Sequence, residues 1–293
     1  MIVVVRAGAL TTVQDLGRPG LAHLGVPRSG ALDTPAHVLA NRLVGNPASA
    51  ATLETTLTGV AVRCVRDTVV AVTGAFSTVR CDGRAVPWGA AVRVPAGAVL
   101  DVGPARRGVR GYVAFDGGLT PPPVLGSRAT DLLSGLGPPR LTTGDTLPLG
   151  TPPEPSASEL SPKRTATPEA APTPAPPVEL VLRVRLGPRE DWFVDAARDL
   201  GRGRYSVATP SNRIALRTDG PAVRRVGPGE LPSEGMVLGA VQVPADGSPI
   251  VFLADHPTTG GYPVIGVVLE DDLAAAAQAR PGAPVRFVPL GTR

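Results

Sequence analysis

A carboxylate and an imidazole stand side by side at Asp255-His256, directly after the apolar run 250–254. Asp and His are common general acids and bases, so this pair is a candidate for proton transfer. The loop that follows is Thr258-Thr259-Gly260-Gly261. Hydroxyl groups and turned backbone N–H groups bind anions, so this loop is a candidate site for a negatively charged oxygen. A plain polar turn between two strands would have the same composition, and these residues alone support both interpretations equally.

The residues before this pair have the sequence pattern of a β-hairpin. Two apolar runs, Val237–Val243 and Ile250–Ala254, flank a turn that contains Asp246-Gly247. Asp-Gly between such runs is a strong signal for a tight connection between antiparallel strands. We therefore expect the second strand of the hairpin to fix the position of Asp255 and His256.

A second region of interest is the Gly- and Pro-rich loop 13–33, followed by a predicted helix. Long ordered loops in compact domains usually carry function, and the density of glycine favours an ordered loop here. Thr34 is predicted to cap the helix, with Pro35 at its first position and Gly45 as its end. His37 and Asn41 lie four residues apart, on one face of this helix. Polar pairs of this kind usually lie on a solvated face, which is the prediction here, and the alternative is that they line a pocket.

The composition indicates a mainly β, α+β chain of two domains. Its 293 residues include 35 Gly and 34 Pro, with only 3% aromatic residues, which favours short strands and turns over long helices. Separate strands are predicted within 51–115, among them 69–73, 78–81, 99–102 and 110–115, as an antiparallel meander or barrel. The tract 151–177, rich in Pro, Ala, Ser and Thr, is predicted to be a linker between domains 1–150 and 178–293.

The charge pattern and the absence of several motifs exclude common functions. Lys163 is the only lysine, and it is followed by Arg164, so the chain has no P-loop for ATP. The arginines behind the net charge of +4 are scattered singly, which is not the pattern of a nucleic-acid surface. No apolar run has the length of a signal-peptide core or a membrane span, so we expect a cytoplasmic protein that does not engage a membrane.

Metal and nicotinamide chemistry are disfavoured as well. The chain has neither GxSxG nor a GxGxxG that opens a strand-to-helix turn, and its 3 His and 2 Cys have no ligand spacing for zinc, so no metal site is expected. Cys64 and Cys81 are predicted to be reduced thiols. Turns that carry Arg, Ser, Thr, Asp and Gly remain, and these suit a small anionic or amide-bearing ligand.

Several ordered motifs together resemble the biotin-dependent carboxyltransferase family. They are Gln14-Asp15-Leu16-Gly17-Arg18-Pro19-Gly20, Gly25-Val26-Pro27 with Ser29-Gly30-Ala31 and Asp33, Ala40-Asn41, Leu53-Glu54, Leu125-Gly126-Ser127-Arg128 with Thr130, and Gln242 with Asp255 and Thr258-Thr259-Gly260-Gly261-Tyr262-Pro263. The family includes the C subunit of 5-oxoprolinase, the KipA antagonist protein and the carboxyltransferase subdomains of urea carboxylase. The resemblance covers nearly the whole chain except the linker.

The resemblance implies two β-barrel-like subdomains, the second similar to a cyclophilin-like barrel, in a protein similar to the C subunit of an ATP-dependent 5-oxoprolinase. Such an enzyme opens the pyroglutamate lactam to glutamate, and this chain would be active as a hydrolase only with two sister proteins, a B-like (KipI-like) protein and a lactam-opening A subunit. ATP would be shared with those partners. Negative charge develops on a planar amide in this reaction, so fixed donors would lower its barrier.

The resemblance also implies roles for individual residues. Asp255 and His256 would be catalytic, with Asp255 as the proton acceptor. The implied substrate-binding residues are Arg28, Ser29, Asp33, Asn41, Arg213, Gln242, Thr258, Thr259, Gly260 and Gly261.

Two alternatives to 5-oxoprolinase stay open. One is a regulatory KipA-like protein that binds a kinase-inhibitor partner. The other is biotin-dependent transfer of a carboxyl group to a urea-like amide. In that case the biotin must come from another chain, because Lys163 has no flanking Met and lies in the predicted linker.

Overall fold

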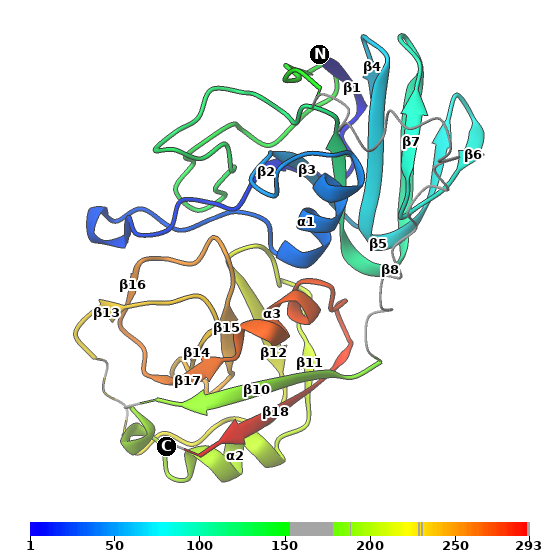
Figure 1. Cartoon of the computed structure of the whole chain (residues 1–293). Coiled ribbons are helices and arrows are strands. Elements are labelled where there is room, and N and C mark those ends of the chain that lie inside the picture. The colour runs from blue at the N-terminus through cyan, green and yellow to red at the C-terminus, as the bar shows by residue number, and fades with distance from the viewer. Residues whose placement is uncertain (153–177, 188, 228, 230, 292–293) are drawn as a thin grey trace. The chain divides into compact units, whose positions relative to one another are not determined.

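The computed structural model of the chain describes residues 1–152, 178–187, 189–227, 229 and 231–291 (Figure 1). These residues form two compact units. The first comprises 1–17, 33–130 and 136–152, and the second comprises 18–32, 131–135 and the described residues from 178 onward. Two short segments of the N-terminal half are thus part of the second unit, which the division at 150 and 178 did not anticipate. Most of the predicted linker 151–177 lies outside the described residues.

The elements of the first unit are β1 (Ile2–Arg6), β2 (Leu10–Gln14), α1 (Thr34–Leu43), β3 (Thr52–Thr56), β4 (Val60–Cys64), β5 (Thr68–Cys81), β6 (Arg84–Val86), β7 (Ala91–Val94), β8 (Val99–Phe115) and β9 (Thr146–Leu147). The elements of the second unit are η1 (Ala22–Leu24), β10 (Leu180–Leu186), η2 (Glu190–Trp192), α2 (Ala196–Arg202), β11 (Tyr205–Val207), β12 (Ala215–Asp219), β13 (Glu234–Gly235), β14 (Ala240–Gln242), β15 (Ile250–Phe252), β16 (Thr259–Gly260), β17 (Val264–Val268), α3 (Glu270–Ala277) and β18 (Pro284–Leu290).

The first unit is built on a nine-stranded antiparallel sheet. Its main path runs β2-β3-β8-β4-β1-β9, and β5 joins through β8 and carries β6 and β7. Alternate residues of a strand face the same side of a sheet, and Ile2 and Val4 of β1 and Val60 and Val62 of β4 meet in this way in one apolar core. The unit is therefore a β structure as predicted, and its sheet curls into a half-barrel, in agreement with the expected barrel-like subdomain.

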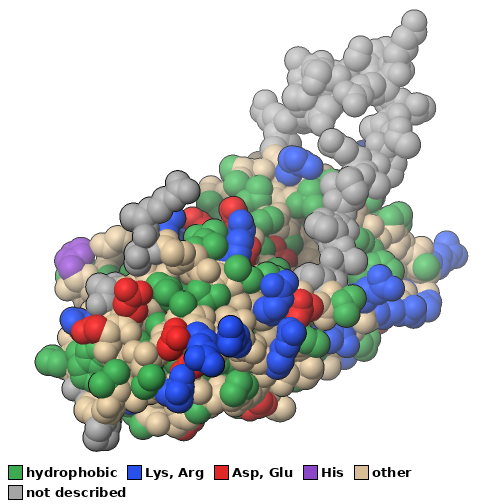
Figure 2. Space-filling view, turned by 90° about the horizontal axis from the view of Figure 1, so that it is seen from below, with side chains coloured by type: hydrophobic (Ala, Val, Ile, Leu, Met, Phe, Trp, Pro, Cys, Tyr) green, Lys and Arg blue, Asp and Glu red, His purple; other side chains and the backbone are tan. Residues whose placement is uncertain are grey.

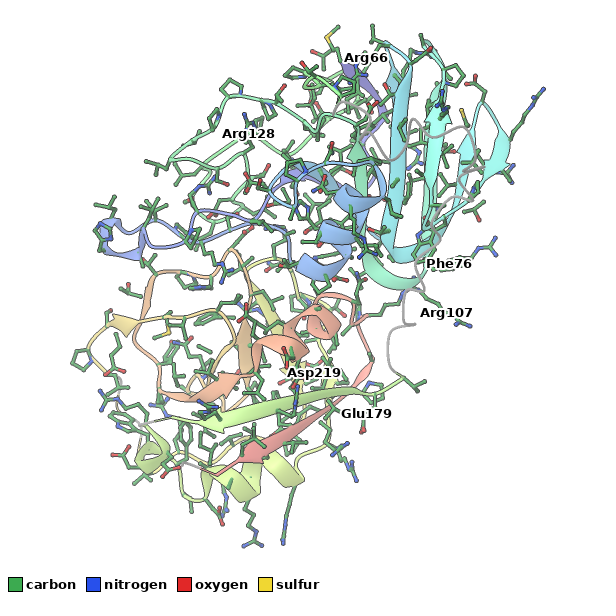
Figure 3. All side chains as sticks on the ribbon, viewed as in Figure 1. Arg66, Phe76, Arg107, Arg128, Glu179 and Asp219 are labelled. Carbon is green, nitrogen blue, oxygen red and sulfur yellow. The ribbon has the colours of Figure 1, made fainter. Side chains whose placement is uncertain are left out.

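Two long strands replace four predicted ones in this sheet. The stretches 69–73 and 78–81 belong to β5, and 99–102 and 110–115 belong to β8. The β5–β8 pair shifts register between Gly74 and Val79, and such bulges bend a ladder without ending it. Gly74 has φ 78°, and a Cβ there would lie 2.4 Å from the carbonyl oxygen of Arg110, so this bend requires glycine. Phe76 and Arg107, labelled in Figure 3, are opposed across this bent ladder.

The second unit is a closed barrel with strand order β10-β17-β14-β15-β12-β11-β18, closed by the parallel pair β18 and β10. In β10, Leu180, Leu182 and Val184 alternate with less buried residues and enter the core. The helix α3 adds Leu273 and two alanines to the same core, so both helix and barrel strands stabilise it. The predicted C-terminal barrel is confirmed, and so is the hairpin, which β14 and β15 form with Val241 opposite Val251.

Both cysteines are free thiols, as predicted. Cys64 is buried, and desolvation raises the pKa of its thiol to about 11, so the thiol stays protonated near neutral pH. Such a thiol is a packing residue of the first unit and not a nucleophile.

Charged side chains of both signs are interspersed with apolar ones on the face of the molecule seen in Figure 2. Among the described residues, no helix is both long enough and apolar enough to span a bilayer. No group of three or more metal-ligating side chains occurs within the same residues.

Candidate functional site

The site centres on the side chain of Asp255, three residues past the end of β15 and completely buried. Arg213, just before β12, is equally buried and donates from Nε and Nη2 to the two Asp255 oxygens at 2.9 Å each. The same guanidinium donates to the carbonyl oxygen of Gly30 at 2.7 Å. The guanidinium of Arg213 therefore binds Asp255 and the 18–32 segment. Because its donors are used in this way, the geometry does not favour the predicted contact of Arg213 with substrate.

The Asp255 carboxylate also ties two distant segments to the barrel. Its Oδ1 accepts from the Ser29 hydroxyl at 3.0 Å, and its Oδ2 accepts from the backbone N–H of Leu132 at 3.1 Å. Ser29 in turn donates its backbone N–H to the carbonyl of Ala254 at 2.9 Å. Ser29 has φ 55°, a conformation rare in residues other than glycine, and these bonds hold it there.

Three charged or titratable residues are next in sequence to the residues that these hydrogen bonds join. Arg28 precedes Ser29, Asp131 precedes Leu132, and His256 follows Asp255. Arg28 also lines a surface groove of about 410 Å³, together with Arg185, Glu270 and several Leu and Val side chains. The network therefore gathers a cation, a carboxylate and an imidazole on one unit, next to a groove with apolar walls.

His256 has a defined tautomer in this site. Its Nδ1 lies 2.7 Å from the carbonyl oxygen of Pro257, which can only accept, so Nδ1 carries the proton and Nε2 is the acceptor. The ring stacks on Phe252 with centroids 6.0 Å apart. Burial lowers the pKa of His256, and the positive charge of Arg28 lowers it further, while the carbonyl of Pro257, Asp255 and Asp131 oppose the shift. The imidazole is thus neutral near pH 7.

His256 is a second candidate for the proton acceptor, besides the predicted Asp255. Each of its oxygens already accepts two hydrogen bonds, one of them from the guanidinium of Arg213. Both oxygens are thus occupied by donors of this chain. The neutral His256 ring makes no hydrogen bond through Nε2 to any described residue, so it is the better placed of the two to accept a proton.

A family model for the carboxyltransferase domain, subdomain A and B, matches residues 24–289. The chain belongs to this carboxyltransferase family. It is 38% identical over 292 residues to the C subunit of 5-oxoprolinase from Escherichia coli, and the match covers 98% of this chain and 91% of that protein.

Crystal structures agree with this carboxyltransferase assignment. The structure of TTHA0988 matches with a TM-score of 0.85 and 38% identity, over 98% of this chain and 55% of that one. The Kluyveromyces lactis urea carboxylase matches with a TM-score of 0.87 and 30% identity, over 99% of this chain and 27% of that one. The chain thus spans about half of the first solved protein and about a quarter of the second.

The carboxyltransferase loop 258–261 differs from the anion-binding turn predicted for it. Thr259 and Gly260 form β16, which pairs with β13. Neither Gly260 nor Gly261 has a positive φ, although a concave nest of N–H groups needs left-handed residues. Gln242 donates to the carbonyl of Tyr262 at 3.2 Å, so it fastens this segment to β14. Thr258, too, is engaged through its backbone carbonyl, which accepts from the N–H of Met236.

The predicted substrate residues Asp33 and Asn41 belong to the first unit and support α1. Asp33, and not Thr34, is the N-cap, and its side chain accepts from the N–H of Ala36 at 3.0 Å. Asn41 donates to the carbonyl of Ala50 at 2.8 Å and accepts from Asn46 at 3.1 Å. Asp33 thus caps the start of α1, and Asn41 holds the chain that follows the helix, so the geometry favours a structural role for both residues.

The prediction of a solvated face for His37 and Asn41 is wrong, because both side chains are completely buried. The ring of His37 lies 2.9 Å from the Thr52 hydroxyl and 3.0 Å from the carbonyl of Ala48. Both ring nitrogens thus have partners, which is how a buried imidazole is normally accommodated.

Two further aspartates, which the predicted site did not include, lie within or directly after the family motifs. Asp15 accepts from the Ser127 hydroxyl at 2.6 Å and the backbone N–H of Arg128 at 2.6 Å, and so joins two motifs far apart in the sequence. Asp131 lies three residues beyond Arg128 and was missed, because the sequence showed only another polar turn. Its position directly after the Ser127-Arg128 motif is the signal that could have found it.

Proposed function

We propose that this chain is the C subunit of an ATP-dependent 5-oxoprolinase, in which it contributes to opening the lactam of 5-oxoproline to glutamate. The observation that carries the proposal is the 38% identity to the Escherichia coli C subunit, which extends over 98% of this chain and 91% of the relative. The match includes both units and every segment that the Asp255 network ties together.

The chemistry available at the Asp255 network suits this reaction. Opening a lactam requires a base that activates a nucleophile and groups that stabilise negative charge on the amide. Neutral His256 supplies the base through Nε2, and the guanidinium of Arg28 supplies positive charge for an anionic group of the substrate. Asp255 and Arg213 act as positioning residues, because they fix the backbone on either side of these groups.

Sister subunits complete the enzyme in this proposal. A B-like (KipI-like) protein and a lactam-opening A subunit are the expected partners, and the nucleotide would be bound with their help, since the sequence has no P-loop. The chain then works as part of a hydrolase only in the assembled hetero-oligomer, in the cytoplasm.

Reconstitution tests the proposal directly. The chain is mixed with separately purified A and B subunits, and glutamate release and ATP hydrolysis are followed with 5-oxoproline present or absent. Activity that requires all three subunits and the substrate supports the proposal. Turnover by the A and B subunits alone at the full rate would contradict it and leave a regulatory, KipA-like role for the chain.

A second candidate is biotin-dependent carboxyl transfer to a urea-like amide. The specific observation in its favour is the TM-score of 0.87 with the Kluyveromyces lactis urea carboxylase. A biotin carboxylase and biotin carrier, added with the chain, ATP, bicarbonate and urea, would then give carboxylated urea. This outcome with no 5-oxoproline-dependent activity would favour the second candidate over the first.

A further inference from the structure

Asp131 has a buried carboxylate oxygen that accepts no hydrogen bond from the part of the chain that the structure describes. The side chain is 2% exposed. Its Oδ1 accepts from the backbone N–H groups of Leu133 at 2.7 Å and Ser134 at 2.9 Å. Its Oδ2 is buried and accepts no hydrogen bond from any described residue. The turn at 131–134 therefore fixes one oxygen and leaves the other without a donor among the described residues.

A buried acceptor without a donor costs free energy, and a charged one costs more than a neutral one. Such a cost in a folded protein is a reason to look for a ligand that supplies the missing donor. Asp255 already accepts two hydrogen bonds on each oxygen, so it cannot serve as that acceptor. Asp131 is the carboxylate of this cluster that still has an oxygen to offer.

The surroundings of Asp131 indicate which donor is missing. Leu132, its neighbour, is tied to Asp255, which places Asp131 in the same cluster as Arg28 and His256. The side chain of Arg28 lines the groove together with Arg185 and Glu270. It makes no hydrogen bond or ion pair to any described residue, so it is available for an anionic group of a ligand. A ligand that satisfies both residues carries an anion and, at another point, an N–H group. A lactam that bears a carboxylate has both.

We propose that Asp131 is a substrate-binding residue whose Oδ2 accepts the N–H of the lactam ring, while Arg28 pairs with the substrate carboxylate. This assignment rests on the proposed function. It also explains how the enzyme would select a lactam over a lactone. A lactone has a ring oxygen where the lactam has N–H. Two acceptors would then face each other at Asp131, and the lactone would be rejected.

The test measures selectivity on the assembled complex of all three subunits in the absence of ATP. Calorimetry gives the affinity for 5-oxoproline and for its lactone analogue, in which oxygen replaces the ring N–H. The parent complex is expected to prefer the lactam by about 10- to 100-fold, the range for a hydrogen bond to a charged group. Asp131→Asn places an amide N–H₂ opposite the ring, so it is expected to abolish or reverse this preference.

Asp15→Asn is the matched control. Asp15 is also a buried aspartate that accepts backbone and hydroxyl donors, but Oδ1 and Oδ2 both have protein partners. This variant is expected to lose stability and to keep the parental ratio of lactam to lactone affinity. A merely structural Asp131 would give the same result as this control.

The outcomes separate the two proposals. If the parent complex turns over 5-oxoproline but Asp131→Asn keeps the parental ratio, Asp131 does not bind the lactam N–H and the proposed function stands. If the parent complex neither binds nor turns over 5-oxoproline, the proposed function itself fails. If Asp131→Asn does not assemble, the parent complex decides the matter, because equal affinity for lactam and lactone would overturn the assignment.

Discussion

Arg213 and Asp255 form a two-pronged ion pair in which neither side chain has any exposed surface. Removing one partner of such a pair leaves the other charge buried without compensation, which costs about 3–5 kcal/mol. Arg213→Ala is therefore expected to lower the free energy of unfolding by this amount in urea titrations. Arg286→Ala is the control, because its pair with Glu179 is 41% and 40% exposed, and it should change the midpoint little. Equal effects of both variants would contradict the structural importance of the buried pair.

Asp255→Asn is expected to reduce both stability and the activity of the complex. The amide keeps the shape of the side chain but leaves Arg213 without its counter-charge and presents N–H groups to donors such as Leu132. Thermal unfolding and glutamate release are measured on the same preparation. Loss of activity at unchanged stability would instead favour the sequence-based prediction that Asp255 accepts a proton.

His256→Asn isolates the function of one ring nitrogen. The amide N–H of asparagine can still donate to the Pro257 carbonyl, as Nδ1 does, whereas the Nε2 acceptor is lost. Loss of a positioned general base typically lowers the rate about 10²- to 10⁴-fold, so kcat of the reconstituted complex should fall by that order. Gel filtration checks assembly. A kcat within a few-fold of the parent would remove His256 from the chemistry.

Stability should depend on pH through the buried histidines. Burial is the main cause that lowers the pKa of His37 below its ordinary value of 6.5, and the nearby carboxylates Asp15 and Glu54 oppose the shift. The unfolded state then binds more protons than the folded state below about pH 6.5, so the free energy of unfolding falls as the pH drops through that value. Urea titrations of parent and His37→Gln at about pH 7.5 and 5.5 test this. The variant should show a smaller loss on acidification, and an identical loss would contradict the assignment to His37.

Alanine substitutions at two glycines of the first unit distinguish the cost of a left-handed backbone from the cost of a steric clash. Gly74 and Gly97 both have positive φ, but a Cβ at Gly74 would lie 2.4 Å from the Arg110 carbonyl, whereas nothing lies within 4 Å at Gly97. Gly97→Ala is expected to cost about 1–2 kcal/mol from the left-handed conformation alone. Gly74→Ala adds overpacking against the backbone and should cost about 2–5 kcal/mol. Similar urea midpoints for the two variants would show that the bend in β5 can relax.

Local patterns allowed prediction of the hairpin and the barrel strands, because alternation and an Asp-Gly turn act over a few residues. The bend at Gly74 was mistaken for a break, since a bulge and a turn use the same residue types. His37 and Asn41 were placed in solvent because sequence spacing identifies a helix face without saying what covers it. Asp131 escaped notice because its relation to His256 comes from chain segments 125 residues apart, which no local pattern encodes.

The Ser29–Asp255 hydrogen bond joins residues that are 226 positions apart. On a ribosome that adds about 5–20 residues per second, Ser29 is made roughly 10–45 s before its partner. During this interval the nascent segment 18–32 carries Leu32, which belongs to the core of the second unit, with no barrel to receive it. Assembly of this unit must therefore wait until the segment around Asp255 has been made, and until then Leu32 is expected to be accessible to chaperones that bind short apolar segments.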